Sequence, residues 1–336
     1  MTHHHGVPKL PDSIRPQSRG VLADPGLAAD FRRDGFVKAT LVSPAVVMSL
    51  KDELDALRPL AAAPHGTVMG GTVDYHCSAM DPDVVYRRQL NAIIRARIGD
   101  AATAMFDGFR LLYATLYIKQ TGLGTFPMHQ NWPILSDLND TSVTIWVPLV
   151  AIDANNGGVC LVPGSHKLAP HINGPRTPAF YDERLPSLTE RAVRADLQLG
   201  EAIIFDDSVI HGSSPNCSPA LRPAMQLIFV PNDSLPVFYH DGQDGSFEMV
   251  HADTDFWIDT DFAALGQRQP DWQSVGMVES RNRRVDEAGL NALLARGAEL
   301  RTVGFDAARP PIAPVPTRYT GDRRPWWRRA LSAFRG

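Results

Sequence analysis

A succession of short apolar segments between residues 109 and 231 constrains the fold more than any other feature of the chain. The first, FRLLYATLYIK at 109–119, alternates in polarity and is rich in aromatic and β-branched residues, which is typical of a strand. Four more follow, bounded by Gly, Pro, Asn or Asp: TSVTIWVPLVAI, GGVCLVP, EAIIFDD and AMQLIFVP. Strands that follow one another without intervening helices predict an antiparallel sandwich or barrel rather than alternating βαβ units.

Helical patterns flank this region. We expect a short strand at residues 36–39 and then a helix that starts at Ser43-Pro44, a suitable N-cap and first helical position. Apolar residues recur at helical spacing after this pair: Val46, Val47, Leu50, Leu54 and Leu57. Further helices are expected at 88–107 and 285–300. The predicted fold class is therefore an all-β core with flanking helices.

Composition excludes several classes of protein. The 336 residues are 44% hydrophobic and 21% charged, as in an ordinary globular protein, and the net charge of −4 gives no reason to expect nucleic-acid binding. No apolar run reaches the roughly 18 residues of a membrane span, and the N-terminus lacks the apolar segment of a signal peptide. Three scattered cysteines without CxxC spacing suit a reducing compartment. We therefore expect a cytoplasmic location.

We divide the chain into four parts. Residues 1–26 are expected to form a flexible arm, 27–240 the β domain, and 241–308 an extension packed on it. Within the β domain, the proline- and charge-rich segment 168–198 predicts a long loop over the sheet. Residues 309–336 combine a proline-rich linker with a basic amphipathic tail, which could contact a membrane surface. Docking of this tail on its own domain is the interpretation that we prefer.

Two histidines and an arginine are the residues that point to chemistry. His129 follows the strand at 109–119, and His211 ends the strand of EAIIFDDSVIH. Histidines that face one another across a sandwich can share a metal, although a single histidine there is more often structural. Arg222 starts the next strand, eleven residues beyond His211. A buried arginine needs an anionic partner, and both a dicarboxylate cosubstrate and an ordinary acidic side chain satisfy that need.

The order of four sequence blocks adds a family resemblance. The blocks are DGFVKATLVSPAVVMSLKDELDAL near the N-terminus, HQN at 129–131, IWVPLVAIDANNGGVCLVPGSHK at 145–167 and GEAIIFDDSVIHGSSPNCSPALRPA at 200–224. With them, the stretch 29–231 resembles the phytanoyl-CoA dioxygenase-like family of Fe(II)/2-oxoglutarate oxygenases. HQN falls where that family has an H-x-D motif, commonly HQD.

The resemblance implies a double-stranded β-helix, which is a jelly-roll sandwich, with helices on its outer face. It also implies iron bound by His129 and His211, and 2-oxoglutarate bound through its distal carboxylate by Arg222. Three further residues occupy positions that line the pocket of the cosubstrate or substrate: Lys119, Gln130 and Trp146. The PGSHK turn, including His166, is expected to serve structure rather than to bind metal.

Asn131 replaces the aspartate of the family motif, and three interpretations remain open. The amide oxygen of Asn131 could serve as a neutral third ligand, which would weaken iron binding. Alternatively, another carboxylate could substitute; Asp137 lies eight residues beyond His129, and Asp206 and Asp207 precede His211. Thirdly, the protein could have lost iron chemistry.

The sequence thus predicts a non-haem Fe(II)/2-oxoglutarate-dependent oxygenase that uses O2 to hydroxylate an unactivated C–H bond of a small molecule. The alternative is an altered or metal-free family member, which binds a small molecule or performs non-oxidative chemistry in the same pocket. Asn131 is the residue on which the two predictions differ.

Overall fold

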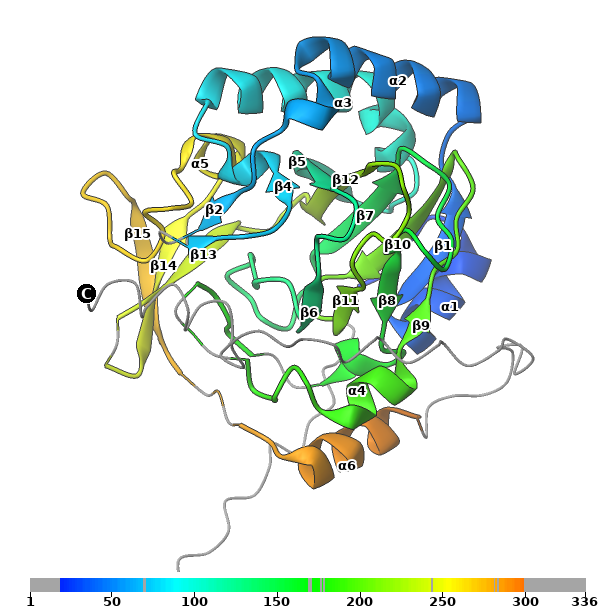
Figure 1. The fold of residues 1–336 in the computed structure, drawn as a ribbon. Coiled ribbons are helices and arrows are strands. Elements are labelled where there is room, and N and C mark those ends of the chain that lie inside the picture. The colour runs from blue at the N-terminus through cyan, green and yellow to red at the C-terminus, as the bar shows by residue number, and fades with distance from the viewer. Residues whose placement is uncertain are drawn as a thin grey trace, which may run out of the picture.

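A computed structural model describes residues 19–298 of the chain, apart from residues 69–70, 169–170, 176, 178, 243, 281 and 283. Two antiparallel sheets form its centre (Figure 1). The larger has six strands, in the order β1 (Phe36–Thr40), β10 (Glu201–Asp206), β7 (Val143–Pro148), β12 (Arg222–Pro231), β5 (Phe109–Lys119) and β4 (His76–Cys77). The smaller has four, in the order β6 (Phe126–His129), β11 (His211–Ser213), β8 (Val159–Leu161) and β9 (Val193–Arg194). This pair of sheets is the double-stranded β-helix that the sequence predicted.

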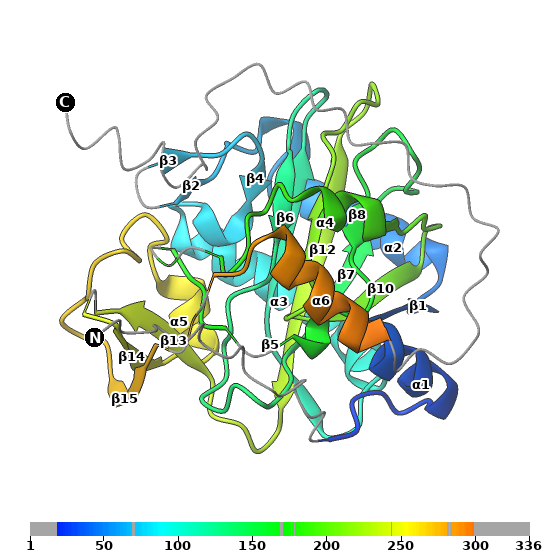
Figure 2. The ribbon, with the colours of Figure 1, turned by 90° about the horizontal axis from the view of Figure 1, so that it is seen from below.

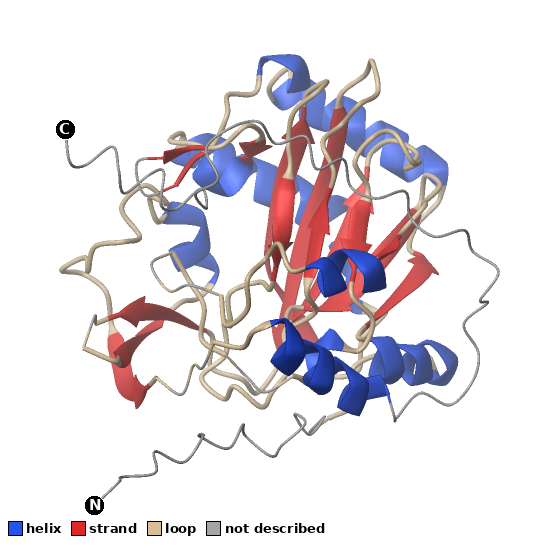
Figure 3. Cartoon of the chain, turned by 60° about the horizontal axis from the view of Figure 1, so that its bottom comes forward, coloured by secondary structure: helices blue, strands red, loops and turns tan. Residues whose placement is uncertain are grey.

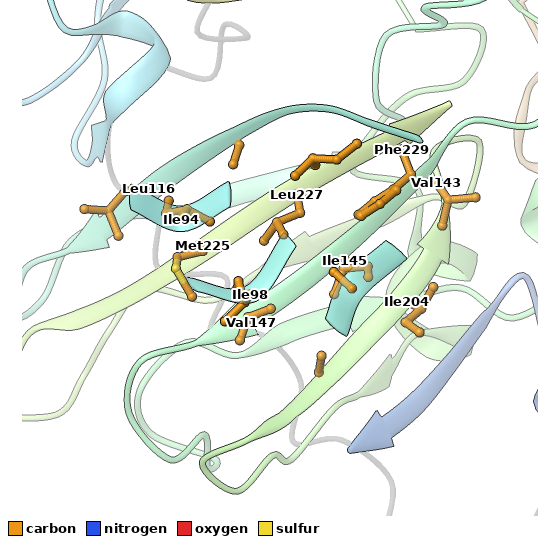
Figure 4. Packing of buried hydrophobic residues seen from close by; sticks show 14 of the residues in the cluster. Ile94, Ile98, Leu116, Val143, Ile145, Val147, Ile204, Met225, Leu227 and Phe229 are labelled. Carbon is orange, nitrogen blue, oxygen red and sulfur yellow. The ribbon is translucent and has the colours of Figure 1, made fainter. Parts of the chain in front are cut away.

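Helices cover the outer face of the larger sheet. Helices α2 (Pro44–Leu57) and α3 (Val84–Thr103) lie across it, and α1 (Pro25–Asp34) lies beside β1 (Figure 1). Alternate side chains of β5, β7 and β12 point outward and pack against α3, as Figure 4 shows; they include Leu116, Ile145, Leu227 and Phe229. Because strand side chains alternate between faces, the intervening residues point toward the smaller sheet, where the predicted site residues lie.

The helix predicted at 88–107 is α3, which begins and ends four residues earlier. The early start has a clear cause, since the carboxylate of Asp83 accepts a hydrogen bond from the backbone N–H of Tyr86 and caps the helix. Ser43 occupies the predicted N-cap of α2, but its hydroxyl makes no capping hydrogen bond. The strand predicted at 109–119 is confirmed to the residue.

The described residues of the segment 168–198, which was predicted as a long loop, include two regular elements. It contains α4 (Pro186–Arg191) and the edge strand β9. Helix α6 (Glu287–Ala298), which the sequence predicted, packs against α4 on the outer side of the smaller sheet (Figure 2). Apolar residues of both helices, among them Leu188 and Leu290, bury one another there.

A third, three-stranded sheet extends the jelly roll at one end (Figure 3). It is formed by β13 (Val237–Asp241), β14 (Ser246–His251) and β15 (Ser274–Glu279), with α5 (Thr254–Asp259) after β14. The boundary drawn at residue 240 therefore falls inside β13. Short elements complete the described chain: β2 (Thr67–Val68), β3 (Gly71–Thr72), and the 3₁₀ turns Leu60–Ala62, Ser78–Met80 and Ser165–Lys167.

The prediction of a flexible arm over residues 1–26 is wrong for its last part. Val21 and Leu22 are buried in the main core, and Leu22 pairs with Phe106. Arg19 forms ion pairs with Asp140 in the loop after β6 and with Asp233 in the loop after β12, and these pairs hold the segment in place. Residues 1–18 and the tail at 309–336 lie outside the described residues. Among the helices described, none has both the length and the apolar character of a membrane span.

The packing of α3 on the larger sheet generates a stability prediction. Phe229 is fully buried between sheet and helix, so replacing Phe229 by Ala should lower the free energy of unfolding by about 3–5 kcal/mol through lost burial and a cavity. Val85→Ala on the exposed side of α3, where the valine is 64% exposed, should change it by less than about 0.5 kcal/mol. Chemical denaturation measures both values, and equal effects would contradict this packing.

Candidate functional site

The two predicted histidines are direct neighbours across one strand pair. Strand β6 pairs antiparallel with β11, and His211 stands opposite His129 in that register. The centres of the two imidazole rings are 4.3 Å apart, and the ring of Phe205 packs 4.7 Å from that of His211. The sequence predicted that the two residues come together, and the structure brings them together.

Backbone carbonyls fix the protonation of both rings. Nδ1 of His129 lies 2.8 Å from the carbonyl oxygen of Pro127, and Nδ1 of His211 lies 2.8 Å from that of Val209. A carbonyl oxygen only accepts, so each Nδ1 carries the proton and each Nε2 presents a lone pair. Burial lowers the pKa of both histidines, and the neighbouring His129 lowers that of His211 further. Both rings are therefore held in the neutral form that can bind a metal.

Asn131 is held by a buried carboxylate. Its Nδ2 donates to Oδ1 of Asp207 at 2.8 Å and to Oγ1 of Thr144 at 3.2 Å, and its backbone N–H donates to the carbonyl of Asp207. The hydroxyl of Thr144 donates in turn to the same Oδ1, at 2.6 Å. With the amide nitrogen engaged in this way, the oxygen of Asn131 is the donor that this side chain can offer to a metal.

Within the described part of the chain, no carboxylate completes the histidine pair. Among the described residues, no three His, Cys, Asp or Glu side chains are grouped closely enough to hold a metal ion. Asp137 instead accepts from the backbone N–H of Asn139 in its own turn, and Asp206 accepts from that of Ser208. The structure therefore gives no support to the interpretation in which another carboxylate takes the place of the missing ligand.

Two buried cations stand opposite each other on the neighbouring sheet. Lys119 ends β5 and Arg222 begins β12, and the two are paired in register. Their exposed fractions are 0% and 3%. Nζ of Lys119 donates to Oγ of Ser213 at 2.6 Å and to the carbonyl of Ser214 at 2.7 Å. The guanidinium carbon of Arg222 lies 5.4 Å from the ring centre of Trp146, and its Nε has no hydrogen-bond partner.

The charge of this pair is not balanced within the described residues. Burial lowers the pKa of Lys119 strongly, and the nearby Arg222 lowers it further. Burial alone lowers the pKa of Arg222 to about 9, so the guanidinium stays charged at neutral pH. No described carboxylate forms an ion pair with it, and a buried guanidinium without an anionic partner is costly.

The interior face of β5 carries further residues beside this pair that were not predicted. Tyr117 and Thr115 follow Lys119 on the same face at intervals of two residues, and the buried Oγ1 of Thr115 has no hydrogen-bond partner. Gln226 of β12 is paired in register with both Thr115 and Trp146. The alternation of FRLLYATLYIK places Thr115 and Tyr117 on the same face as Lys119, so the sequence could have identified these two residues.

Gln130 lines a small hollow together with Asn131 and Asp207. Its Nε2 donates to the carbonyl of Ser208 at 2.7 Å. The remaining walls come mostly from the loop between β6 and β7, and include Ile134, Leu135 and Asp137. The hollow is therefore adjacent to the asparagine and not to the cation pair.

The PGSHK segment has the structural role that was predicted for it. Gly164 adopts φ 78°, a left-handed conformation that favours glycine, and a 3₁₀ turn follows it. The hydroxyl of Ser165 accepts from the N–H of Ile210, and so supports the residue before His211. His166 lies in this turn, where its Nε2 is 3.3 Å from the carbonyl oxygen of Arg32.

Several solved structures resemble the chain at low identity. SnoN from nogalamycin biosynthesis, solved with Fe3+, alpha-ketoglutarate and nogalamycin RO, is 20% identical, with coverage of 77% of this chain and 93% of SnoN and a TM-score of 0.47. EctD from S. alaskensis, solved with 2-oxoglutarate and 5-hydroxyectoine, is 17% identical, with coverage of 81% and 94% and a TM-score of 0.47. AviO1 from Streptomyces viridochromogenes Tue57 is 19% identical, with coverage of 63% and 96% and a TM-score of 0.44.

A family comparison gives the assignment. Residues 31–224 match the family described as Phytanoyl-CoA dioxygenase (PhyH). The matched range is more than half of the chain, and it includes His129, Asn131, His211 and Arg222. The chain belongs to the phytanoyl-CoA dioxygenase family.

Proposed function

We propose that the protein is an Fe(II)- and 2-oxoglutarate-dependent oxygenase that hydroxylates an unactivated C–H bond of a small molecule. One observation carries this proposal: two neutral histidines are paired in one sheet, and two buried cations, Lys119 and Arg222, are paired in the other. Family membership supports the same conclusion.

The donors in the interior fit a divalent transition metal. The carbonyls of Pro127 and Val209 orient the two rings, and hydrogen bonding of Nδ1 to a carbonyl is the usual support of a metal-binding histidine. The residues that would hold the metal are His129 and His211 through Nε2, with the amide oxygen of Asn131 as a neutral third donor. Bound iron would supply the activation of O2, coupled to oxidative decarboxylation of 2-oxoglutarate.

The cation pair fits a dicarboxylate. The planar guanidinium of Arg222 presents two parallel N–H donors to one carboxylate, and its unpartnered Nε shows that the described side chains do not use its full capacity. Lys119 adds a second nitrogen donor beside it, and its hydrogen bonds to Ser213 and Ser214 fix the position of Nζ. These residues would bind and orient the cosubstrate.

Aromatic side chains border the histidine pair on the side of His129. The ring of Phe126 lies 6.3 Å from that of His129 and 4.0 Å from that of Tyr75, and Tyr117 packs against both Phe126 and Tyr75.

The first prediction concerns formation of the metal–cosubstrate complex. Anaerobic addition of Fe(II) and 2-oxoglutarate should produce a weak visible charge-transfer band, because the cosubstrate chelates a metal held by the two histidines. His211→Ala should abolish the band, since it removes one of only two nitrogen donors. Absence of the band from the unaltered protein at millimolar iron, with its appearance in Asn131→Asp, would show that the natural protein is not an oxygenase.

The second prediction concerns the anion pocket. Arg222→Ala should weaken 2-oxoglutarate binding by at least about 30-fold, because it removes a buried charged partner of the cosubstrate. Calorimetric titration of 2-oxoglutarate into Ni(II)-treated protein measures the dissociation constant. Arg88→Ala is the matched control, since Arg88 is half exposed and pairs with Asp255 and Asp259. Equal dissociation constants in the two variants would exclude Arg222 from the cosubstrate site.

A further inference from the structure

The contact between Asn131 and Asp207 joins two segments that lie 76 residues apart. Asp207 is 5% exposed, and the hydroxyl of Thr144 and the amide of Asn131 both donate to its Oδ1. The hydroxyl of Thr144 also accepts from Asn131, so the three side chains form a closed hydrogen-bonded group. None of the described cations forms an ion pair with Asp207.

The chemistry of these groups fixes the orientation of the asparagine. An ionised carboxylate only accepts hydrogen bonds, so the amide nitrogen of Asn131 must face Asp207 and its oxygen must face away. Donation to a carboxylate is charge-assisted, and in a buried network it polarises the donor group. The oxygen of Asn131 thereby gains negative character that an isolated amide lacks.

The charge of Asp207 also needs a partner. Burial raises the pKa of Asp207 to about 6, and its hydrogen bonds to Ser142, Thr144 and Asn131 oppose that shift. Oδ1 of Asp207 accepts the hydrogen bonds from both Thr144 and Asn131, as an ionised carboxylate does. A buried anion without a cation is costly, and a divalent metal beside Asn131 would supply the compensating charge.

We propose that Asp207 is a positioning residue, which directs the amide oxygen of Asn131 to the metal. Through its hydrogen bond to Asn131, the carboxylate of Asp207 also supplies the negative charge that the missing aspartate would have brought as a direct ligand. This inference rests on the proposed function, since it requires a metal at His129 and His211. It assigns a defined role to the H-x-N sequence: Asn131 and Asp207 together replace one carboxylate ligand.

The test is a double-mutant cycle read out as metal affinity. Calorimetry with Ni(II) at pH 7.5 compares the unaltered protein, Asp207→Asn, Asn131→Asp and the double variant that carries both substitutions. Asp207→Asn alone should weaken Ni(II) binding by about 10- to 100-fold, which is the usual cost of losing a residue that supports a metal ligand. In the Asn131→Asp background the same substitution should weaken it by less than about 3-fold, because the carboxylate then stands at the ligand position itself.

Asp206→Asn is the matched control, since Asp206 is an equally buried neighbour that accepts from Ser208 and is not hydrogen-bonded to Asn131. It should leave Ni(II) affinity within about 2-fold, and circular dichroism verifies the fold of every variant. A merely structural role for Asp207 would weaken binding equally in both backgrounds, which would overturn the inference, as would an unchanged affinity in Asp207→Asn.

A further variant separates this inference from the proposed function. If His211→Ala abolishes Ni(II) binding but Asp207→Asn does not affect it, only the role of Asp207 is wrong. If His211→Ala binds Ni(II) as the unaltered protein does, the metal does not reside at the histidines, and the proposed function fails together with the inference.

Discussion

The pairing of β6 with β11 is the interaction on which the candidate site depends. It places His211 opposite His129, and the carbonyl two residues before each histidine then fixes the ring. A slip of one residue in this register would turn one imidazole out of the interior, because strand side chains alternate between faces. The four-residue strand β6 is short, so its register needs other support. The hydroxyl of Ser165 provides some of it by accepting from Ile210 at the entry to β11.

The interior of the jelly roll carries charges that its own side chains do not balance. Arg222 is a buried cation without an acidic partner, and Asp207 is a buried anion without a basic one, as far as the described residues extend. The two do not neutralise each other, because each is held on a different strand end by its own hydrogen bonds or packing. An anionic cosubstrate and a metal cation are complementary to these two charges. The buried charges of Arg222 and Asp207 that lower the stability of the unliganded protein are therefore the same charges that would bind the ligands.

Much of the fold could be predicted from the sequence because it depends on the local pattern of apolar and polar residues. Alternation predicted β5 to the residue, and the spacing of His129, His211 and Arg222 identified residues that the structure places at strand ends. The contact between Asn131 and Asp207 was not readable. It depends on how the loop after β6 meets the end of β10, and local pattern does not encode the approach of two distant segments. The packing of residues 19–24 on the core was not predicted for the same reason. Only two residues of this segment, Val21 and Leu22, are buried in the core, and so short a stretch gives no periodic pattern.

The neutral donors of the histidine pair have a consequence for the order of binding under the proposed function. Two imidazoles and an amide contribute no formal charge, so a divalent metal held by them keeps most of its positive charge. The dianionic cosubstrate then compensates the metal as well as Arg222, and each ligand favours the binding of the other by the same factor. In a protein with an aspartate at position 131, part of that charge would already be neutralised, and the coupling would be weaker. The asparagine at position 131 therefore makes metal binding more dependent on the cosubstrate. The nearby carboxylate of Asp207 reduces that dependence, because it compensates part of the metal's charge.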